Sequence, residues 1–150
     1  MGLKETLQSD LTEAIRSRDE LTSGTIRMVL SAITNEEVSG KSARVLTEAE
    51  IITVLSREAK KRREAADAFR DAGRADKSEL ETKEGEVIAR YLPAQLSEDE
   101  LKKLIAEAIT ETGATGPAGM GQVMKLIQPK IAGKADGGLV SSLVKAALNG

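Results

Sequence analysis

The sequence has 150 residues, and its 22 lysines and arginines nearly balance 24 aspartates and glutamates, so the net charge of -2 indicates no particular class of partner. It contains no cysteine and no histidine, which excludes disulfides, thiol nucleophiles, imidazole catalysis and the common zinc sites. No signal peptide and no apolar run of membrane-spanning length is visible. We therefore predict a cytoplasmic protein without a metal, a cofactor or a membrane partner.

Apolar residues spaced three and four positions apart predict four helices in the first part of the chain. These helices are expected over residues 3–15, 26–39, 48–73 and 76–92. The third begins with a capping box, in which the side chains of Thr47 and Glu50 bond to the backbone of the first turn. Pro93 ends the fourth, because proline has no amide hydrogen to donate within a helix.

Three shorter helices are predicted in the rest of the chain, over residues 97–113, 120–128 and 139–148. A second capping box, Ser97 with Glu100, begins the first of them, and Pro129 ends the second. No segment shows the alternation that is typical of a strand. We predict an all-α protein, with an N-terminal bundle of longer helices over residues 1–93 and a small three-helix domain over residues 94–150.

Three charged residues fall within the apolar helical faces, namely Glu37, Arg62 and Glu84. If the third and fourth helices form an antiparallel hairpin, Arg62 and Glu84 lie at similar distances from its turn. We hypothesise a partly buried Arg62–Glu84 pair, with Glu37 as a candidate third member. An equally weighted alternative is that these side chains extend to water from the edges of the faces. A structural role is favoured over a catalytic one, because a buried Arg–carboxylate pair more often specifies packing.

The glycine-rich run from Gly119 to Gly138 invites comparison with nucleotide-binding loops. A P-loop requires Ser or Thr after its Gly-Lys pair, whereas Gly133-Lys134 is followed by Ala135. The dinucleotide-binding pattern also fails, since Met124 stands where its last glycine is required. Nowhere do the residues assemble a nucleophile, a base and an oxyanion site. The sequence thus predicts turns and helix ends in this run, and no catalytic residues in the chain.

Two groups of basic residues remain. In the first, on the third helix, acidic neighbours favour a solvated helix face over a binding patch: Arg57, Lys60, Lys61 and Arg63. In the second, within residues 113–150, four lysines stand against one aspartate, a local charge of +3: Lys125, Lys130, Lys134 and Lys145. Lysines beside glycine-rich backbone can hold phosphates. Because this segment has no aromatic side chain for base stacking, any contact would be with the nucleic-acid backbone.

Four stretches carry a resemblance to a known family: IRMVLSAITNEE (Ile26–Glu37), REAKKRREAADAF (Arg57–Phe69), YLPAQLSEDEL (Tyr91–Leu101) and GMGQVMKLIQPKIAGKADGGLVSSLVKAAL (Gly119–Leu148). In this order they resemble the YqeY-like proteins. The last stretch is also similar to the C-terminal domain of the B subunit of the tRNA-dependent amidotransferase, an enzyme that amidates misacylated tRNA. The resemblance implies a helical N-terminal domain and a three-helix tail that helps hold tRNA.

By position, the resemblance implies RNA contacts at two motifs of the tail. Gly121, Val123 and Met124 match the motif that opens its middle helix, and residues 133–137 match the turn before its last helix. Gln122 stands where a Lys is common and Lys134 where an Arg is common, so one charge and one planar guanidinium are lost. The complete set of candidate RNA-binding residues is Gly121, Gln122, Lys125, Lys130, Gly133, Lys134, Gly137 and Lys145.

We therefore predict a non-catalytic protein that binds tRNA, or a tRNA-processing complex, through its C-terminal helical domain. One alternative is a component of a glutamine-dependent carbon–nitrogen ligase, since the amidotransferase has that activity. Its ammonia-generating centre belongs to another subunit and its tRNA-activating centre to a domain that this chain lacks. A second alternative is a helical adaptor with a protein partner, which the near-neutral charge fits equally well.

Overall fold

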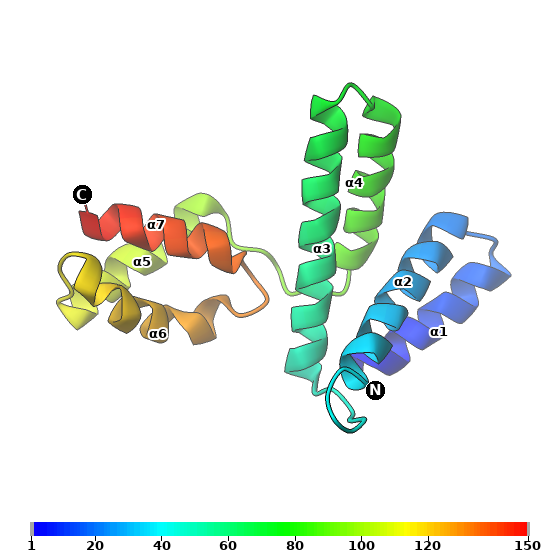
Figure 1. Cartoon of the computed structure of the whole chain (residues 1–150), viewed down its shortest axis with the longest axis horizontal. Coiled ribbons are helices and arrows are strands. Elements are labelled where there is room, and N and C mark those ends of the chain that lie inside the picture. The colour runs from blue at the N-terminus through cyan, green and yellow to red at the C-terminus, as the bar shows by residue number, and fades with distance from the viewer. Residues whose placement is uncertain (1, 150) are drawn as a thin grey trace. The chain divides into compact units, whose positions relative to one another are not determined.

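The computed structural model describes residues 2–149, and within that range it contains helices and no strand (Figure 1). The all-α prediction is confirmed. The α-helices are α1 (Leu3–Arg16), α2 (Glu20–Glu37), α3 (Glu48–Asp71), α4 (Ala75–Ala89), α5 (Glu98–Thr112), α6 (Met120–Ile131) and α7 (Gly137–Asn149), and the 3-10 turn η1 covers Pro117–Gly119. The chain forms two compact units, unit 1 over Met1–Leu92 and unit 2 over Pro93–Gly150.

Local side-chain bonds set most of the helix starts. Both predicted capping boxes are present, with Thr47 and Ser97 each accepting a bond from the backbone amide of a glutamate three residues later. The predicted start of α2 at Ile26 is wrong. The helix begins six residues earlier, because the Asp19 carboxylate accepts a hydrogen bond from the Thr22 amide at 3.0 Å.

The end of α6 differs from the prediction as well. Helix α6 runs through Pro129 to Ile131. Proline removes one hydrogen bond of the helix, but the amide of Ala132 still donates to the Gln128 carbonyl at 3.1 Å. The turn between α6 and α7 therefore begins beyond Pro129, and the lysines at positions 130 and 134 flank it.

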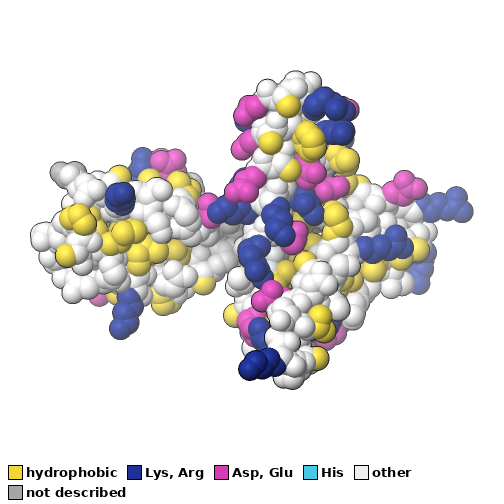
Figure 2. All heavy atoms as spheres, viewed as in Figure 1, with side chains coloured by type: hydrophobic (Ala, Val, Ile, Leu, Met, Phe, Trp, Pro, Cys, Tyr) yellow, Lys and Arg dark blue, Asp and Glu magenta, His cyan; other side chains and the backbone are white. Residues whose placement is uncertain are grey.

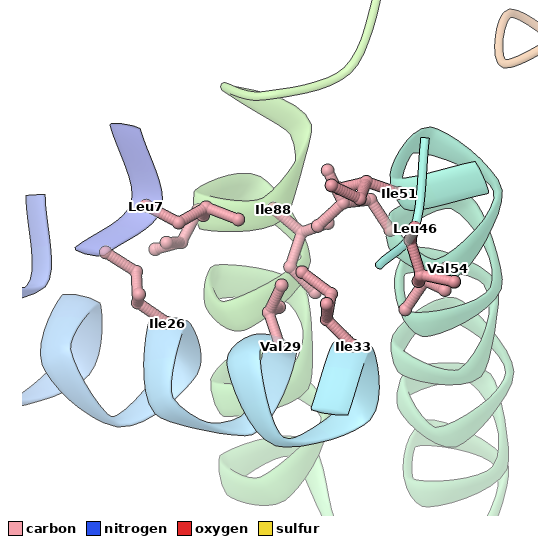
Figure 3. Packing of buried hydrophobic residues seen from close by; sticks show 10 residues of the cluster. Leu7, Ile26, Val29, Ile33, Leu46, Ile51, Val54 and Ile88 are labelled. Atoms are coloured by element: carbon pink, nitrogen blue, oxygen red, sulfur yellow. The ribbon is translucent and has the colours of Figure 1, made fainter. Parts of the chain in front are cut away.

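Unit 1 is built from two helical hairpins, α1 with α2 and α3 with α4, and α2 also packs against α4. Its core consists of aliphatic side chains from all four helices and from the loop before α3 (Figure 3): Leu7, Ile26, Val29, Ile33, Leu46, Ile51, Val54, Leu55, Val87 and Ile88. Burying each large aliphatic side chain contributes about 1.5–3 kcal/mol relative to leaving it exposed. These contacts account for the stability of the unit without aromatic residues in its centre.

Tyr91 closes one end of unit 1. Its hydroxyl donates a hydrogen bond of 2.5 Å to Asp10 Oδ2, which ties the residues after α4 to α1. Burial, together with this bond to a carboxylate, raises the pKa of Tyr91 above its ordinary value, so the hydroxyl keeps its proton and the hydrogen bond further into the alkaline range.

Unit 2 has its own core, formed by α5, α6, α7 and the segment around η1. Helix α5 packs against both α6 and α7, and η1 contacts both of these helices. The buried residues are Leu101, Ile105, Ala108, Ala114, Val123, Ile127, Ile131, Val140 and Val144.

Candidate nucleic-acid interface

Arg62 is the centre of a charge cluster in unit 1. Its Nε lies 3.2 Å from Glu84 Oε2 and 3.8 Å from Glu81 Oε2, and its Nη2 lies 3.7 Å from Glu58 Oε2. The same Nη2 donates to Met28 Sδ at 3.3 Å. All four charged side chains are between 12% and 21% exposed. The structure thus brings together the Arg62 and Glu84 of the predicted pair, and it adds two carboxylates that the sequence did not indicate.

This cluster holds three carboxylates and one guanidinium, so its charges are not balanced. Burial, followed by the nearby charge of Glu81, raises the pKa of Glu84, while Arg62 opposes the rise. Two polar atoms of the cluster, Arg62 Nε and Glu81 Oε2, make no hydrogen bond. The contacts are therefore ion pairs of imperfect geometry between the faces of α3 and α4, which suits a structural role.

Glu37 is not part of this cluster, and its suggested contact with Arg62 is wrong. Its carboxylate instead lies 2.9 Å from Lys4 Nζ and accepts a hydrogen bond from the Leu46 amide at 3.3 Å. The bond from Lys4, with further help from the Leu46 amide, lowers the pKa of Glu37. Both partners are distant in sequence, so helical periodicity alone did not reveal them.

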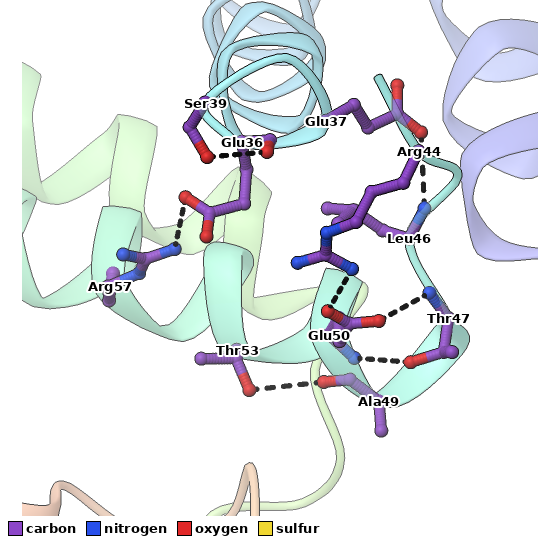
Figure 4. A network of polar contacts seen from close by, with 10 residues as sticks. All are labelled: Glu36, Glu37, Ser39, Arg44, Leu46, Thr47, Ala49, Glu50, Thr53 and Arg57. Atoms are coloured by element: carbon purple, nitrogen blue, oxygen red, sulfur yellow. Dashed lines mark hydrogen bonds and ion pairs between the residues drawn. The ribbon is translucent and has the colours of Figure 1, made fainter. Parts of the chain in front are cut away.

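Glu37 belongs to a polar network that fixes the loop between α2 and α3 (Figure 4). The Arg44 amide donates to the Glu37 carbonyl at 3.0 Å, and its guanidinium lies 2.5 Å from Glu50 Oε2. Glu50 also completes the capping box at the start of α3. The network holds Leu46 in the core and leaves Val45 85% exposed.

The candidate basic patch on α3 is largely engaged with acidic side chains. Arg57 lies 3.3 Å from Glu36 Oε2, and Lys61 lies 3.2 Å from Glu58 Oε1. Lys60 also has a polar or electrostatic partner, while Arg63 is exposed. Figure 2 shows the result, with basic and acidic side chains interspersed over α3 and α4. These contacts favour a solvated, paired helix face over a phosphate-binding surface.

The lysines of the C-terminal unit contrast with this patch. Four lysine side chains there are exposed, and within residues 2–149 they form no ion pair: Lys125, Lys130, Lys134 and Lys145. An unpaired ammonium can meet an incoming anion without first breaking an internal contact. These lysines are therefore open to a phosphate.

The lysines do not form a single cluster. Lys125 and Lys130 are five residues apart on α6, which places them about 140° apart around the helix. Lys130 lies in the last turn of α6 and Lys134 in the loop that follows it. Lys145 lies near the opposite end of this pair of helices, because α7 returns toward η1. The pair at the turn is thus separate from Lys125 and from Lys145.

The backbone of the α6–α7 turn is fixed at Gly133 and at Lys134. Gly133 adopts a φ of +73°, a conformation that favours glycine. Its carbonyl accepts a bond from Gln95 Nε2 at 2.9 Å, and the Lys134 carbonyl accepts one from the Leu96 amide at 2.9 Å. The turn is therefore bound to the first residues of unit 2, which holds the Lys134 backbone in place.

The start of α7 offers less to a phosphate than the sequence suggested. The Asp136 carboxylate accepts a hydrogen bond from the Gly138 amide at 3.3 Å, and its carbonyl accepts one from Val140 at 3.1 Å. The helix end beside Gly137 thus already has a negative cap. Phosphate attraction at this turn would come from the lysine side chains.

Gln122 and Lys125 lie at a surface groove. The groove has a volume of about 480 Å³ and is lined by Thr112 from α5 and by Gln122, Lys125 and Leu126 from α6. Nearby, the position of a Cβ on Gly121 faces open space. The sequence did not predict this groove, because it arises from the packing of α6 on the end of α5.

The described residues hold no group of three or more acidic side chains placed to bind a metal ion. No helix among them has both the length and the apolar character to cross a membrane. The chemistry that the tail can offer is attraction of anions by ammonium groups, hydrogen bonding by exposed side-chain amides such as that of Gln122, and apolar contact in the groove.

The family model described as Yqey-like protein matches residues 4–148, almost the whole chain. The chain belongs to the YqeY-like family. It is 30% identical over 148 residues to altered inheritance of mitochondria protein 41, mitochondrial, from Clavispora lusitaniae, covering 97% of the chain and 84% of that relative. It is 31% identical over 115 residues to the protein of the same name from Lachancea thermotolerans, covering 75% of the chain and 60% of that relative. The match of the YqeY-like chain with its relatives thus spans both units.

Proposed function

We propose that this YqeY-like protein is a non-catalytic accessory protein that binds tRNA through the phosphate backbone, mainly with Lys130 and Lys134. The observation that supports the proposal is the state of the basic side chains. The lysines of α6, α7 and the turn between them are exposed and form no ion pair within residues 2–149, whereas most basic groups on α3 contact carboxylates. When a lysine neutralises a phosphate, a counterion bound to the nucleic acid is released. A lysine without an ion pair can do this without breaking a salt bridge inside the protein.

The turn between α6 and α7 is the part of unit 2 best suited to a phosphate. Lys130 and Lys134 flank a backbone that is held by bonds from Gln95 and Leu96, so little order is lost when the side chains bind. No aromatic side chain is present in residues 93–149 to stack on unpaired bases. The protein would therefore recognise the shape and backbone of tRNA, with little dependence on base sequence.

Filter binding of the full chain to total tRNA across a salt series tests this proposal. The affinity should fall as salt increases, and Lys134→Ala should reduce the slope of log affinity against log salt by about 0.9, the value for one lost phosphate contact on duplex. Lys134→Arg should bind about threefold more tightly, because a guanidinium can contact phosphate through two donors.

Lys83→Ala is the matched control, since Lys83 is an exposed lysine of unit 1 that pairs with Glu79 at 3.1 Å. It should leave the slope unchanged. Undetectable binding at low salt, or equal slopes for the variants at positions 83 and 134, would contradict the proposal. Amide transfer by the chain alone, given glutamine, ATP and misacylated tRNA, would show instead that it is itself a carbon–nitrogen ligase.

We also propose that the chain acts in the cytoplasm. The two relatives are named as mitochondrial proteins, and those names describe the relatives and not this chain. Imaging of the chain with a C-terminal tag in its own cells would test the location, and a signal confined to an organelle would contradict it.

A further inference from the structure

The groove on unit 2 has an apolar floor. The Thr112 hydroxyl donates to the Ala108 carbonyl at 2.8 Å and accepts from the Ala114 amide at 3.3 Å, so its methyl group is the part left for the groove. Leu126 is half-buried beside it and also packs against the core of unit 2. The aliphatic part of Lys125 adds further apolar surface. Water is poorly held by such a floor, and a partner's apolar side chain would displace it favourably.

Two polar groups border this floor, and neither is used within residues 2–149. The Gln122 amide makes no hydrogen bond there, and the Lys125 ammonium makes no ion pair. They lie three residues apart on α6 and so point from the same side of the helix. The groove thus combines an apolar centre with one positive charge and one neutral hydrogen-bonding group along a single edge.

We propose that this groove is a docking site for an acidic amphipathic helix of a protein partner, distinct from the turn that carries Lys130 and Lys134. The groove is open along its length and mostly apolar, which suits the apolar face of a helix lying on the surface. Lys125 would pair with an acidic side chain next to those apolar residues. Gln122 would bond to the partner's backbone or a polar side chain.

The apolar lining of the groove supports a protein over RNA at this position. A phosphate backbone placed over Thr112 and Leu126 would cover apolar surface with charged groups, and no aromatic side chain is present for a base to stack on. Glu111 is exposed on α5 next to Thr112. It would repel acidic side chains at that edge, so the acidic face of the partner helix is expected to lie over α6.

Nuclear magnetic resonance on the uniformly ¹⁵N-labelled full chain tests this inference. The probe is a synthetic helical peptide of about 15 residues with leucine at every third or fourth position and glutamate beside each leucine. A second peptide has lysine in place of every glutamate. Titration with the acidic peptide should give saturable shifts at residues 112, 122, 125 and 126, with little change at residues 130–134.

Charge reversal makes the test specific. Lys125→Glu should weaken binding of the acidic peptide about tenfold and strengthen binding of the lysine-containing peptide, because the sign of the paired charge is exchanged. Lys145→Glu changes the net charge equally on an exposed lysine that does not line the groove, and should leave both affinities unchanged. Leu126→Ala, with retained resonance dispersion showing that unit 2 is folded, should also weaken the acidic peptide.

Several results would overturn the inference. These are the absence of a saturable shift, shifts centred on residues 130–134, or equal effects of the variants at positions 125 and 145. Shifts in the groove that grow with the concentration of the chain alone would assign it to a second copy. Displacement of the acidic peptide by tRNA, accompanied by the same groove shifts, would assign it to RNA. Loss of tRNA binding in Lys134→Ala with retained peptide binding would keep this site separate from the proposed RNA contact.

Discussion

The two units of this YqeY-like protein use their basic side chains in different ways. In unit 1, Arg62, Lys4 and Arg57 each contact a carboxylate on another helix, at distances of 2.9 to 3.3 Å. In unit 2, the lysines of α6, α7 and the turn between them are exposed and form no ion pair within residues 2–149. The basic residues of these two groups therefore have structural contacts in the one case and open surfaces in the other.

This difference follows from how each unit is packed. Unit 1 brings charged residues into partly buried positions between helices, where a guanidinium or ammonium must be paired to be tolerated. The lysines of α6, α7 and the turn between them are exposed and lie outside the core of unit 2, so packing does not require them. A count of charges along the sequence could not separate these cases. The comparison indicates that changes to the partly buried, paired basic residues of unit 1 should affect folding, and that changes to the unpaired lysines of unit 2 should affect binding.

The largest expected effect tests whether the two cores are separate. Ile127 is 1% exposed in the core of unit 2, and this core shares no residue with that of unit 1. Ile127→Ala should destabilise unit 2 by about 2–5 kcal/mol, through lost burial and the cavity left behind. Amide hydrogen exchange should show faster exchange in residues 93–149 and unchanged protection in α1 to α4.

Ile33→Ala is the matched variant in unit 1, where Ile33 is 0% exposed. It should reverse the pattern, with faster exchange in residues 2–92. If either variant accelerated exchange equally in both units, the two cores would be one cooperative structure, and the contrast between the units would concern surface charge alone.

The next effect concerns the charge cluster of unit 1. Arg62→Met leaves Glu58, Glu81 and Glu84 without their guanidinium and should cost about 2 kcal/mol at neutral pH. This is below the cost for a fully buried pair, because the side chains are 12% to 21% exposed. Urea unfolding with far-ultraviolet circular dichroism measures the change in the free energy of unfolding.

The pH dependence of that variant has a definite sign. The pKa of Glu84 is already raised in the folded protein, so its contribution favours folding below its ordinary pKa of 4.5 and is lost as the pH rises through the folded value. Arg62→Met removes the one influence that lowers this pKa. The destabilisation should therefore be largest at neutral pH and shrink as the pH falls and the carboxylates are protonated, with Glu84 protonated first because its pKa is raised. Arg63→Met, an exposed neighbour, should show neither effect; an equal loss there would argue against a structural cluster.

The helical fold was largely predictable because its signals are local. Both capping boxes and the amphipathic faces lie within single helices, where spacing alone determines which side chains meet. The predicted helix bounds were wrong where another residue or bond moved the start or the end of a helix. Asp19 starts α2 before Gly24, and α6 continues past Pro129. Leu80, an apolar residue near the start of α4, is 50% exposed and lies outside the core.

The candidate sites were less predictable because they depend on contacts between helices. The hairpin of α3 and α4 made the Arg62–Glu84 contact foreseeable, as both residues lie at similar distances from the turn. The partner of Glu37, however, is Lys4, which is 33 residues away on another helix. The groove beside Lys125 requires the position of α5 relative to α6. Helical periodicity gives the face of one helix, and it does not give the neighbour that this face meets.

The smallest expected effect sharpens the contrast at the exposed side of unit 2. A Cβ on Gly121 would meet nothing within 4 Å, whereas a Cβ on Gly119 would lie 2.6 Å from that of Ala114. Gly121→Ala should therefore stabilise the chain by about 0.5 kcal/mol by favouring helix, while Gly119→Ala should destabilise it by about 1–3 kcal/mol. If a partner approaches the backbone at Gly121, Gly121→Ala should lower the affinity for that partner although it raises the thermal stability of the chain. Melting curves, together with binding measurements on tRNA and on the acidic peptide, would detect this. A gain in stability with both affinities unchanged would show that neither partner reaches Gly121, and would restrict binding to the lysines of the turn and to the groove.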